Sequence, residues 1–412
     1  MKNIIYYLSI LILCSDIFFA QDYWQKTNGP ASGTISALAV NSSDYIFAGT
    51  YGNGVYISTD KGNSWQQTSL KNKWVNCLII NTNGTIFAGT DNGGVFRSND
   101  NGSTWTQCNK NITWTWVCSF TINPQGHIYT GTYKAGLYYS TDNGDNWISI
   151  NTGLTNPSIT SIIFNSNGDI FLGTDGQGIY RSKDNGLTWT KMGRSGDKIY
   201  CFAISQSGKI FAGISGGITY SNNNGDYWDY VYDMDIMATD IRCILISNNN
   251  VYVAADASDF WASLKGIYYS FDEGNKWTHL KSGLSEGVYS LAIDSKGYIF
   301  AGAKDGFVYR SVNPITSVKD FKTKPNSYGL SQNYPNPFNP VTTIEYSIPQ
   351  KENVKITVYD ILGREIITLV NQIQNAGTYK IKFVANELNS GVYFYKMQAG
   401  NFSDTKKMLL LK

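Results

Sequence analysis

Histidine and charged side chains are scarce in this sequence of 412 residues. Two histidines are too few for a metal centre built from histidine ligands, and we expect neither a metal nor a cofactor. Charged residues make up 16% of the chain, well below the usual quarter, and 33 Lys and Arg nearly balance 31 Asp and Glu. Nucleic-acid-binding proteins carry a clear basic excess, so this balance argues against nucleic acid as a partner.

Long hydrophobic runs are also absent. The apolar stretch from Ile4 to Leu13 is shorter than the roughly 20 residues that a membrane-spanning helix needs, and we expect no transmembrane segment. Lys2 lies before this stretch, and Ala20 precedes a plausible cleavage point. This arrangement is typical of a secretory signal peptide, which we place at residues 1–20.

Cysteines are few, and an odd number remains once the signal peptide is removed, which is not the pattern of a disulfide framework. These cysteines are Cys77, Cys108, Cys118, Cys201 and Cys243. All except Cys108 are expected at one position of the repeat described below, with Ala37 and Ser161 as counterparts, where a small buried side chain fits. Disulfides between neighbouring repeats are not implied, and the redox state of the cysteines stays open.

Glycine and aromatic residues are abundant, with 40 glycines and 14% aromatic residues, a composition typical of strands and turns. A short motif, Ser-x-Asp-x-Gly-x-Ser/Thr-Trp, recurs with variations at intervals of about 40 residues. Its aspartates are Asp60, Asp100, Asp142, Asp184 and Asp272, and Asn223 takes this place in the fifth copy. Around each copy lie four short strand patterns separated by turns. Such a unit is typical of one blade of a β-propeller.

The units number seven, and the last copy stops near Ser311 before its own motif. The missing fourth strand is expected at the other end of the chain, because Trp24–Thr27 resembles Trp65–Thr68, the strand after the first motif. Pairing of the first strand with the last unit would close the ring and remove exposed sheet edges. We therefore predict an all-β fold in which residues 21–311 form a seven-bladed β-propeller.

The recurrent motif resembles the Asp-box, or BNR, repeat, and the resemblance covers residues 23–311. Asp-box propellers include sialidases, xyloglucanase-type endoglucanases, the sortilin ectodomain and a photosystem II assembly factor, so the resemblance implies a fold and says little of function. We expect the boxes to staple hairpins, because the glycine supplies a positive φ and the serine and aspartate side chains bind backbone N–H groups. A calcium loop is not expected, because its glutamate and other ligands are missing.

A different pattern begins after Ser311. Residues 312–329 are expected to form a polar linker, and residues 330–412 alternate as in a small immunoglobulin-like β-sandwich. Within them lie the sequences Asn-Tyr-Pro-Asn-Pro-Phe-Asn-Pro, Val-Tyr-Asp-x-x-Gly-Arg, Ser-Gly-Val-Tyr-Phe-Tyr and Lys-Lys-Met-Leu-Leu-Leu-Lys. These four sequences are specific enough to identify the kind of domain.

They closely resemble the type A C-terminal sorting domain of the type IX secretion system. The resemblance implies a Bacteroidetes-like bacterium, the type IX secretion machinery as a partner, and export through the periplasm and across the outer membrane. The mature protein is then attached to the cell surface or released, and the sequence leaves both open. An ordinary carbohydrate-binding sandwich is the alternative for this segment.

Propeller geometry places the ligand face where the loops between second and third strands meet the loops that join neighbouring blades. Exposed aromatic rings beside carboxylates are suited to sugars, because the rings stack on the apolar faces of sugars and the carboxylates accept hydrogen bonds from hydroxyls. The candidate ligand-binding residues are Tyr51, Trp74, Trp114, Tyr133, Asp256, Phe260 and Trp261. The alternative is that these aromatic side chains pack their own loops.

We assign no catalytic residue. A sialidase would need three arginines around the carboxylate of its substrate. Three propeller arginines share one repeat position beside the motif, which indicates a structural role, and they are Arg97, Arg181 and Arg310. We therefore expect a monomeric, non-catalytic propeller that binds a glycan or a protein at the cell surface or in the medium. The alternatives are a glycoside hydrolase that uses carboxylates of the ligand face and, third, an assembly scaffold.

Overall fold

The computed structural model describes residues 22–237, 239–257, 259–315 and 327–411. The chain divides into two compact units, Met1–Thr316 and Ser317–Lys412. Antiparallel strands build both units, and the helices of the described ranges are the short α1 (Met234–Met237) and the 3-10 helix η1 (Asp259–Leu264). None of the described helices is long and apolar enough to cross a membrane. The predicted signal peptide, residues 1–20, lies outside the described ranges.

The described part of the first unit contains seven four-stranded antiparallel sheets. The first sheet contains β2 (Ile35–Val40), β3 (Ile46–Thr50), β4 (Gly54–Ser58) and β5 (Gln66–Gln67). The second contains β6 (Val75–Ile80), β7 (Ile86–Thr90), β8 (Gly94–Ser98) and β9 (Thr106–Gln107). The third contains β10 (Val117–Ile122), β11 (Ile128–Thr132), β12 (Gly136–Ser140) and β13 (Ile148–Ser149).

The next three sheets repeat this order along the chain. The fourth contains β14 (Ile159–Phe164), β15 (Ile170–Thr174), β16 (Ile179–Ser182) and β17 (Thr190–Gly193). The fifth contains β18 (Ile199–Ile204), β19 (Ile210–Ile214), β20 (Gly217–Ser221) and β21 (Asp229–Tyr230). The sixth contains β22 (Asp240–Ser247), β23 (Asn250–Asp256), β24 (Gly266–Ser270) and β25 (Thr278–His279).

The seventh sheet joins the two ends of the first unit. It contains β26 (Val288–Ile293), β27 (Ile299–Ala303), β28 (Phe307–Ser311) and the N-terminal β1 (Trp24–Pro30). β1 pairs with β28 so that Trp24 lies opposite Ser311, and the Trp24 indole donates a hydrogen bond to the Leu280 carbonyl at 2.9 Å. The prediction that the first strand completes the last sheet is therefore confirmed.

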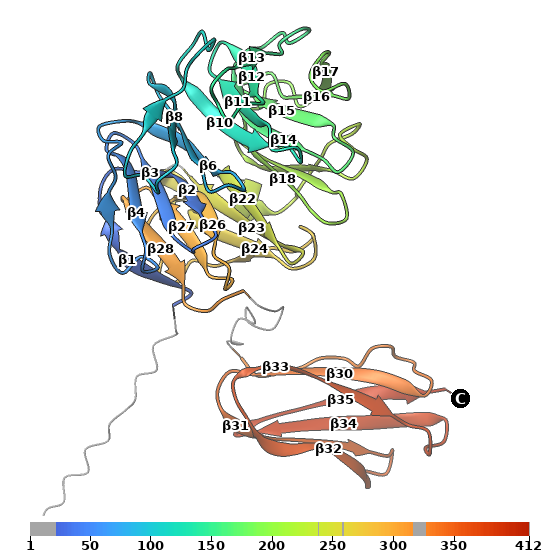
Figure 1. The fold of residues 1–412 in the computed structure, drawn as a ribbon. Helices are drawn as coiled ribbons and strands as arrows, with labels where there is room; N and C mark the ends of the chain where they lie inside the picture. The colour runs from blue at the N-terminus through green and yellow to red at the C-terminus, as the bar shows by residue number, and fades with distance from the viewer. Residues whose placement is uncertain (1–21, 238, 258, 316–326, 412) are drawn as a thin grey trace, which may run out of the picture. The chain divides into compact units, whose positions relative to one another are not determined.

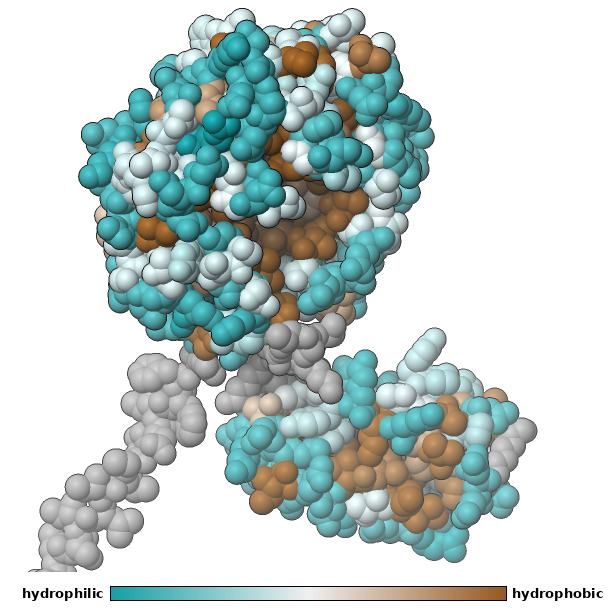
Figure 2. Space-filling model, viewed as in Figure 1, coloured by the Kyte–Doolittle hydropathy of each residue, from teal (hydrophilic) through white to brown (hydrophobic). Residues whose placement is uncertain are grey.

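The first strands of the seven sheets form a closed ring. Each contacts its counterpart in both neighbouring sheets, and β2 contacts both β6 and β26. These strands lie toward the middle of the unit (Figure 1), and Figure 2 shows a hollow there with largely hydrophobic walls. The unit is a β-propeller, as the repeat predicts.

The recurrent motif forms the turn between the third and fourth strands of a sheet. The Asp60 carboxylate accepts hydrogen bonds from the Ser64 amide at 2.8 Å and the Ser64 hydroxyl at 2.6 Å, and the Ser58 hydroxyl accepts one from the Gly62 amide at 2.8 Å. Gly62 has a φ of 89°, which side chains with a Cβ resist. The hydrogen bond that the amide four residues later donates to the side-chain oxygen at this position recurs at Asp100, Asp142, Asp184, Asn223 and Asp272.

The tryptophan that ends each turn links neighbouring sheets. The Trp147 indole donates to the Cys108 carbonyl of the preceding sheet at 2.9 Å, and Trp189 donates to the Ile150 carbonyl at 3.0 Å. Trp147 is almost completely buried. Trp147 and Trp189 each add a large apolar contact and one hydrogen bond to the sheet interface. Trp277 instead donates within its own turn, and Trp228 Nε1 has no hydrogen-bond partner.

One predicted repeat position needs correction. Cys77 lies opposite Gly89, and the equivalent Gly131 faces Ser119 rather than Cys118. Three cysteines therefore share this position, not four. The prediction was wrong because cysteine and serine are both small enough to face a glycine. Side-chain size therefore could not show which of the adjacent residues Cys118 and Ser119 occupies this position. All five cysteines of the described ranges are free.

The chain remains packed on the first unit beyond Ser311. The Val312 amide donates to the Tyr23 carbonyl at 3.0 Å, and Ile315 is buried and donates to the Gly297 carbonyl at 2.7 Å. The first residues of the predicted linker 312–329 thus belong to the first unit. Residues 316–326 of that linker lie outside the described ranges.

The second unit contains two sheets. One is formed by β29 (Gly329–Leu330), β30 (Val341–Ile348) and β33 (Gly377–Val384), and the other by β32 (Glu365–Gln374), β31 (Glu352–Tyr359), β34 (Gly391–Ala399) and β35 (Phe402–Leu410). Ile344 and Phe383 of the first sheet share one buried core with Ile356, Tyr395 and Met408 of the second. Alternating side chains from both sheets fill the space between them, which makes the unit a β-sandwich.

Candidate ligand-binding face

A β-bulge interrupts the innermost strand of every propeller sheet. In β6, for example, Val75 lies opposite Thr90 and Cys77 lies opposite Gly89, so one extra residue, Asn76, lies between them. Because the start of β6 pairs with the end of β7, the bulge lies at the end of the sheet where the loop to the third strand begins. Bulges redirect a side chain out of the regular pattern, often beside functional sites.

The seven bulge residues differ around the ring. They are Ser36, Asn76, Cys118, Thr160, Tyr200, Arg242 and Tyr289. Small members bind the neighbouring sheet, as Asn76 donates to the Val117 carbonyl at 2.9 Å. Three consecutive sheets instead present the large side chains of Tyr200, Arg242 and Tyr289. The ligand face is therefore asymmetric at its centre.

Arg242 lies at the centre of a partly buried polar network, in which Arg242 Nε and Asp256 Oδ1 have no hydrogen-bond partner. Its Nη2 is 2.9 Å from Asp240 Oδ2 and 4.0 Å from Asp256 Oδ2, and its guanidinium lies 4.2 Å from the ring centre of Tyr200. The Tyr200 hydroxyl donates to Asp240 at 3.1 Å, and the Tyr289 hydroxyl donates to Asp256 at 2.8 Å. Two carboxylates and two tyrosines thus hold one arginine in a fixed orientation.

The electrostatics of this network favour neutral tyrosines. Burial raises the pKa of Tyr289, and the neighbouring Asp256 carboxylate raises it further. Burial also raises the pKa of Tyr200, although the Arg242 charge opposes the shift. Both hydroxyls therefore remain hydrogen-bond donors near neutral pH.

An exposed aromatic pair lies on the same face. Trp74 stacks on Tyr51 with 5.7 Å between ring centres, and 56% of Trp74 is exposed. The backbone amide of Asp91 donates to the Trp74 carbonyl at 2.9 Å, so the backbone of Asp91 lies next to that of Trp74. Asp91 Oδ1 is buried without a hydrogen-bond partner, and burial raises the pKa of Asp91.

A second aromatic group lies in the third sheet. Trp116 and Tyr133 contact each other with 4.7 Å between ring centres. The Lys134 ammonium lies 5.1 Å from the ring centre of Tyr133 and 6.0 Å from that of Trp114, which is 44% exposed. This group offers two aromatic faces with a cation between them.

The predicted site residues therefore fall into separate groups. Tyr51 lies with Trp74, Tyr133 lies with Trp114, and Asp256 is buried in the Arg242 network. Phe260 and Trp261 belong to η1, and their side chains lie outside the described part of the structure.

Sequence reasoning missed the bulge residues Tyr200, Arg242 and Tyr289. An alignment of the seven inner strands would have indicated this position, because three sheets have a large polar residue where the other four have a small one. Only the structure shows that they meet, since their contacts join three different sheets.

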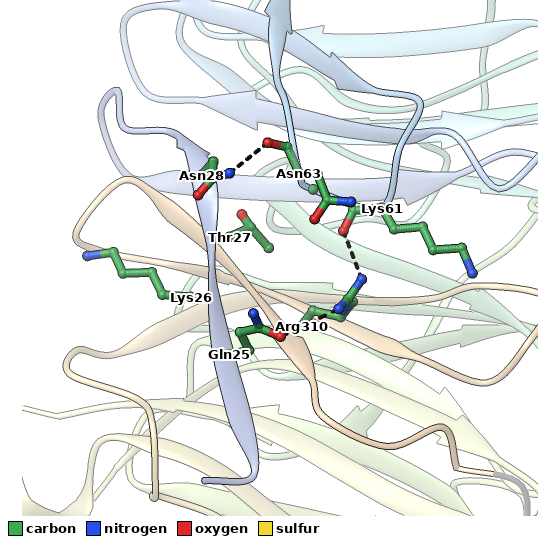
Figure 3. A pocket seen from close by; sticks show the side chains of 8 residues that line it. Gln25, Lys26, Thr27, Asn28, Lys61, Asn63 and Arg310 are labelled. Atoms are coloured by element: carbon green, nitrogen blue, oxygen red, sulfur yellow. Dashed lines mark hydrogen bonds between the residues drawn. The ribbon is translucent and has the colours of Figure 1, made fainter.

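Two further features limit the chemistry. Within the described residues, no group of three or more histidine, cysteine, aspartate or glutamate side chains could hold a metal ion. A small pocket of about 80 Å³ lies away from this face, between β1 and the first recurrent turn (Figure 3). Ligand pockets for small molecules usually exceed about 300 Å³, so the exposed aromatic groups are the stronger candidates for a sugar or a protein.

Three family models match parts of the chain. Residues 332–411 match a secretion system C-terminal sorting domain, residues 53–177 match the sortilin, neurotensin receptor 3 model, and residues 117–241 match the DUF6242 β-propeller domain. A search of curated proteins gave no match. The sorting domain indicates export to the cell surface or secretion.

Many solved structures share the fold. The extracellular domain of a putative one component system from B. thetaiotaomicron is 14% identical with a TM-score of 0.57, and the match covers 92% of this chain and 57% of that one. YCF48 bound to D1 peptide is 15% identical with a TM-score of 0.58, and the match covers 72% of this chain and 96% of that one. The GH74 xyloglucanase from Xanthomonas campestris is 12% identical with a TM-score of 0.59, and the match covers 90% of this chain and 67% of that one.

The chain spans just over half the length of the first of these relatives. At these identities the likeness shows the fold alone. Together with the family models, it describes a secreted β-propeller protein that ends in a secretion-system sorting domain.

Proposed function

We propose that this protein is a seven-bladed Asp-box propeller that binds a glycan or a protein outside the cell, without catalysis. Each four-stranded sheet is one blade, and the recurrent turns are the Asp boxes. The observation that carries the proposal is Trp74, which is more than half exposed, stacks on Tyr51 and lies beside Asp91. Exposed aromatic clusters with polar neighbours are typical of binding sites.

The central carboxylates support binding rather than hydrolysis. A glycoside hydrolase needs one carboxyl group that gives up a proton and a second that acts as base or nucleophile. Asp240 and Asp256 both lie against Arg242, and each also accepts a hydrogen bond from a tyrosine hydroxyl, so both carboxyl groups are already engaged within the network. The network therefore acts as a rigid centre for the face rather than as an acid–base pair.

A glycoside hydrolase is the second candidate, and Asp91 is the observation that favours it. Burial raises the pKa of this carboxyl group, as a general acid requires, and Asp91 lies beside an aromatic platform. The xyloglucanase shares only the fold with this chain. It shows that a propeller fold can carry glycoside hydrolysis, but it assigns no catalytic role to any residue of this chain.

The sorting domain supports a specific route of export. We propose that it is a type A domain with an immunoglobulin-like sandwich, and that the type IX machinery carries the protein through the periplasm and across the outer membrane. The mature propeller then acts as a monomer at the cell surface or in the medium.

The test is binding of the purified protein to arrays of glycans and bacterial surface proteins. Trp74→Ala and Trp114→Ala should each weaken binding at least about tenfold, because a central aromatic anchor contributes more than 1.4 kcal/mol. Phe271→Ala is the matched control, since Phe271 is 52% exposed but lies in a recurrent turn. Unchanged affinity in both tryptophan variants would contradict the proposed site.

An assay for polysaccharide hydrolysis with the same purified protein distinguishes the glycoside hydrolase from the non-catalytic binding protein. Release of reducing ends from a polysaccharide that stops in Asp91→Asn, while binding persists, would show a glycoside hydrolase. Absence of release from every polysaccharide that binds would leave binding as the function.

A further inference from the structure

Three arginines occupy one position of the repeat. Arg97, Arg181 and Arg310 each lie opposite a phenylalanine of the second strand of their own sheet. Each reaches across to the recurrent turn of the following sheet. Comparison of these three junctions shows which contacts the position normally makes.

At two junctions a carboxylate from the following turn neutralises the arginine. Arg97 Nη1 lies 2.9 Å from Asp145 Oδ1, and Arg181 Nη1 lies 2.8 Å from Asp226 Oδ1. In both cases the same nitrogen also donates to a backbone carbonyl of that turn. The arginine thus joins two sheets through one ion pair and one hydrogen bond.

The junction between the seventh and first sheets lacks this carboxylate. Arg310 Nη1 reaches the equivalent backbone carbonyl, that of Lys61, at 3.4 Å, but Asn63 stands where the other turns have Asp145 and Asp226. Arg310 Nε is buried without a hydrogen-bond partner. A guanidinium therefore lies at this junction without the anion that its counterparts have.

A pocket of about 80 Å³ lies at this position. Its lining residues are Gln25, Lys26, Thr27, Asn28, Lys61, Gly62, Asn63 and Arg310. Figure 3 shows the ammonium groups of Lys26 and Lys61 directed away from the pocket centre. Lys26 pairs with Asp305 at 3.1 Å and Lys61 lies 3.8 Å from Asp294, so the guanidinium is the cation that remains for an external anion.

We propose that this pocket binds an oxyanion, the sulfate, phosphate or carboxylate group of a small molecule, in place of the missing carboxylate. The planar guanidinium donates paired N–H groups to such anions. A bound anion would contact β28 through Arg310, β1 through Gln25 and the first recurrent turn through Asn63. It would therefore fasten the N-terminal strand where the ring closes.

The experiment measures the thermal unfolding midpoint of the full chain in sulfate and in chloride at equal ionic strength and millimolar anion. The wild-type protein should show a sulfate-specific rise of about 2–4 °C, because a ligand that binds only the folded state stabilises it. Arg310→Gln should lose this rise. Arg97→Gln is the matched control and should keep it, because that arginine already has Asp145.

A second variant keeps the proposal testable if Arg310→Gln folds poorly. Asn63→Asp places a carboxylate where the other two turns have one, so its midpoint in chloride should exceed that of the wild-type protein. Its sulfate-specific rise should disappear. An equal rise in wild type, Arg310→Gln and Asn63→Asp would show a general salt effect and overturn the proposal.

The source of the anion follows from two further additions. A sulfated disaccharide that raises the midpoint more than inorganic sulfate, while the unsulfated disaccharide has no effect, identifies a sulfate group carried by a glycan. Equal effects of inorganic sulfate and the sulfated disaccharide identify the free ion. Acetate in the same assay tests a carboxylate.

Discussion

Single side chains hold the turns of this propeller. One aspartate oxygen accepts the amide four residues later, and a serine hydroxyl accepts the glycine amide, so a sharp turn has partners for its backbone N–H groups. In the fifth turn Asn223 accepts the same amide bond at 3.0 Å. A neutral oxygen is therefore sufficient for the geometry, and the negative charge adds a pH dependence.

This charge leads to a prediction for acid stability. Hydrogen bonds from Asn146 and Thr188 lower the pKa of Asp142 and Asp184 to about 2, from an ordinary value of 3.8. Because the folded pKa lies below the unfolded one, the stabilisation is full above about pH 4 and is lost as the pH falls toward 2. The denaturant midpoint should fall over this range, and less steeply in the double variant Asp142→Asn/Asp184→Asn.

The control for this experiment removes a carboxyl group outside the recurrent turns. Asp229 lies outside the recurrent turns, and its Oδ1 accepts a hydrogen bond from the adjacent Tyr230 amide, so Asp229→Asn measures the effect of removing a carboxyl group elsewhere in the propeller. Identical slopes in the wild-type protein and the double variant would show that the turn carboxylates do not contribute.

At the scale of elements, β1 is the strand on which the ring depends. It covers the outer edge of β28, and Trp24 fills the position at the sheet interface that the turn tryptophans fill elsewhere. An uncovered strand edge offers free N–H and C=O groups to other chains. Loss of the strand and loss of its tryptophan should therefore have different consequences.

Deletion of residues 22–30 should lower the thermal midpoint and produce self-association in size-exclusion chromatography. Trp24→Ala should cost about 3–5 kcal/mol through lost burial, yet remain monomeric because β1 still covers the edge. A monomeric deletion variant as stable as the wild-type protein would show that the ring does not depend on β1.

The elements also show what the sequence could predict. Four strands per repeat and closure by the first strand follow from a motif whose spacing is visible along the chain. The register error at Cys118 arose because the adjacent residues Cys118 and Ser119 both suit the position by size, so residue type did not fix the alignment of this repeat. The Arg242 network could not be predicted from local pattern, because Tyr200, Arg242 and Tyr289 come from three sheets.

At the scale of the whole molecule, two units with separate cores carry separate tasks. The propeller holds the candidate ligand face, and the sandwich holds the residues that match a sorting domain. Their interiors share no hydrophobic cluster among the described residues. Each unit should therefore fold without the other.

Calorimetry of the full chain should show two transitions. Removal of residues 317–412 should abolish one and move the other by less than about 1 °C, since separate domains unfold separately. A shift of several degrees in the remaining transition would reveal a stabilising contact between the units and contradict independence.

Closure by the first strand has a consequence for the order in which the chain becomes available. Thr27 of β1 bonds to the Val308 carbonyl, a residue 281 positions later. Whether the polypeptide leaves a ribosome or threads through a translocation channel N-terminus first, β1 emerges at the start, and its partner β28 emerges only after the strands of the six intervening sheets. The propeller can therefore close only after β28 has emerged, and a chain cut short before β28 keeps β1 unpaired and open to quality-control proteases.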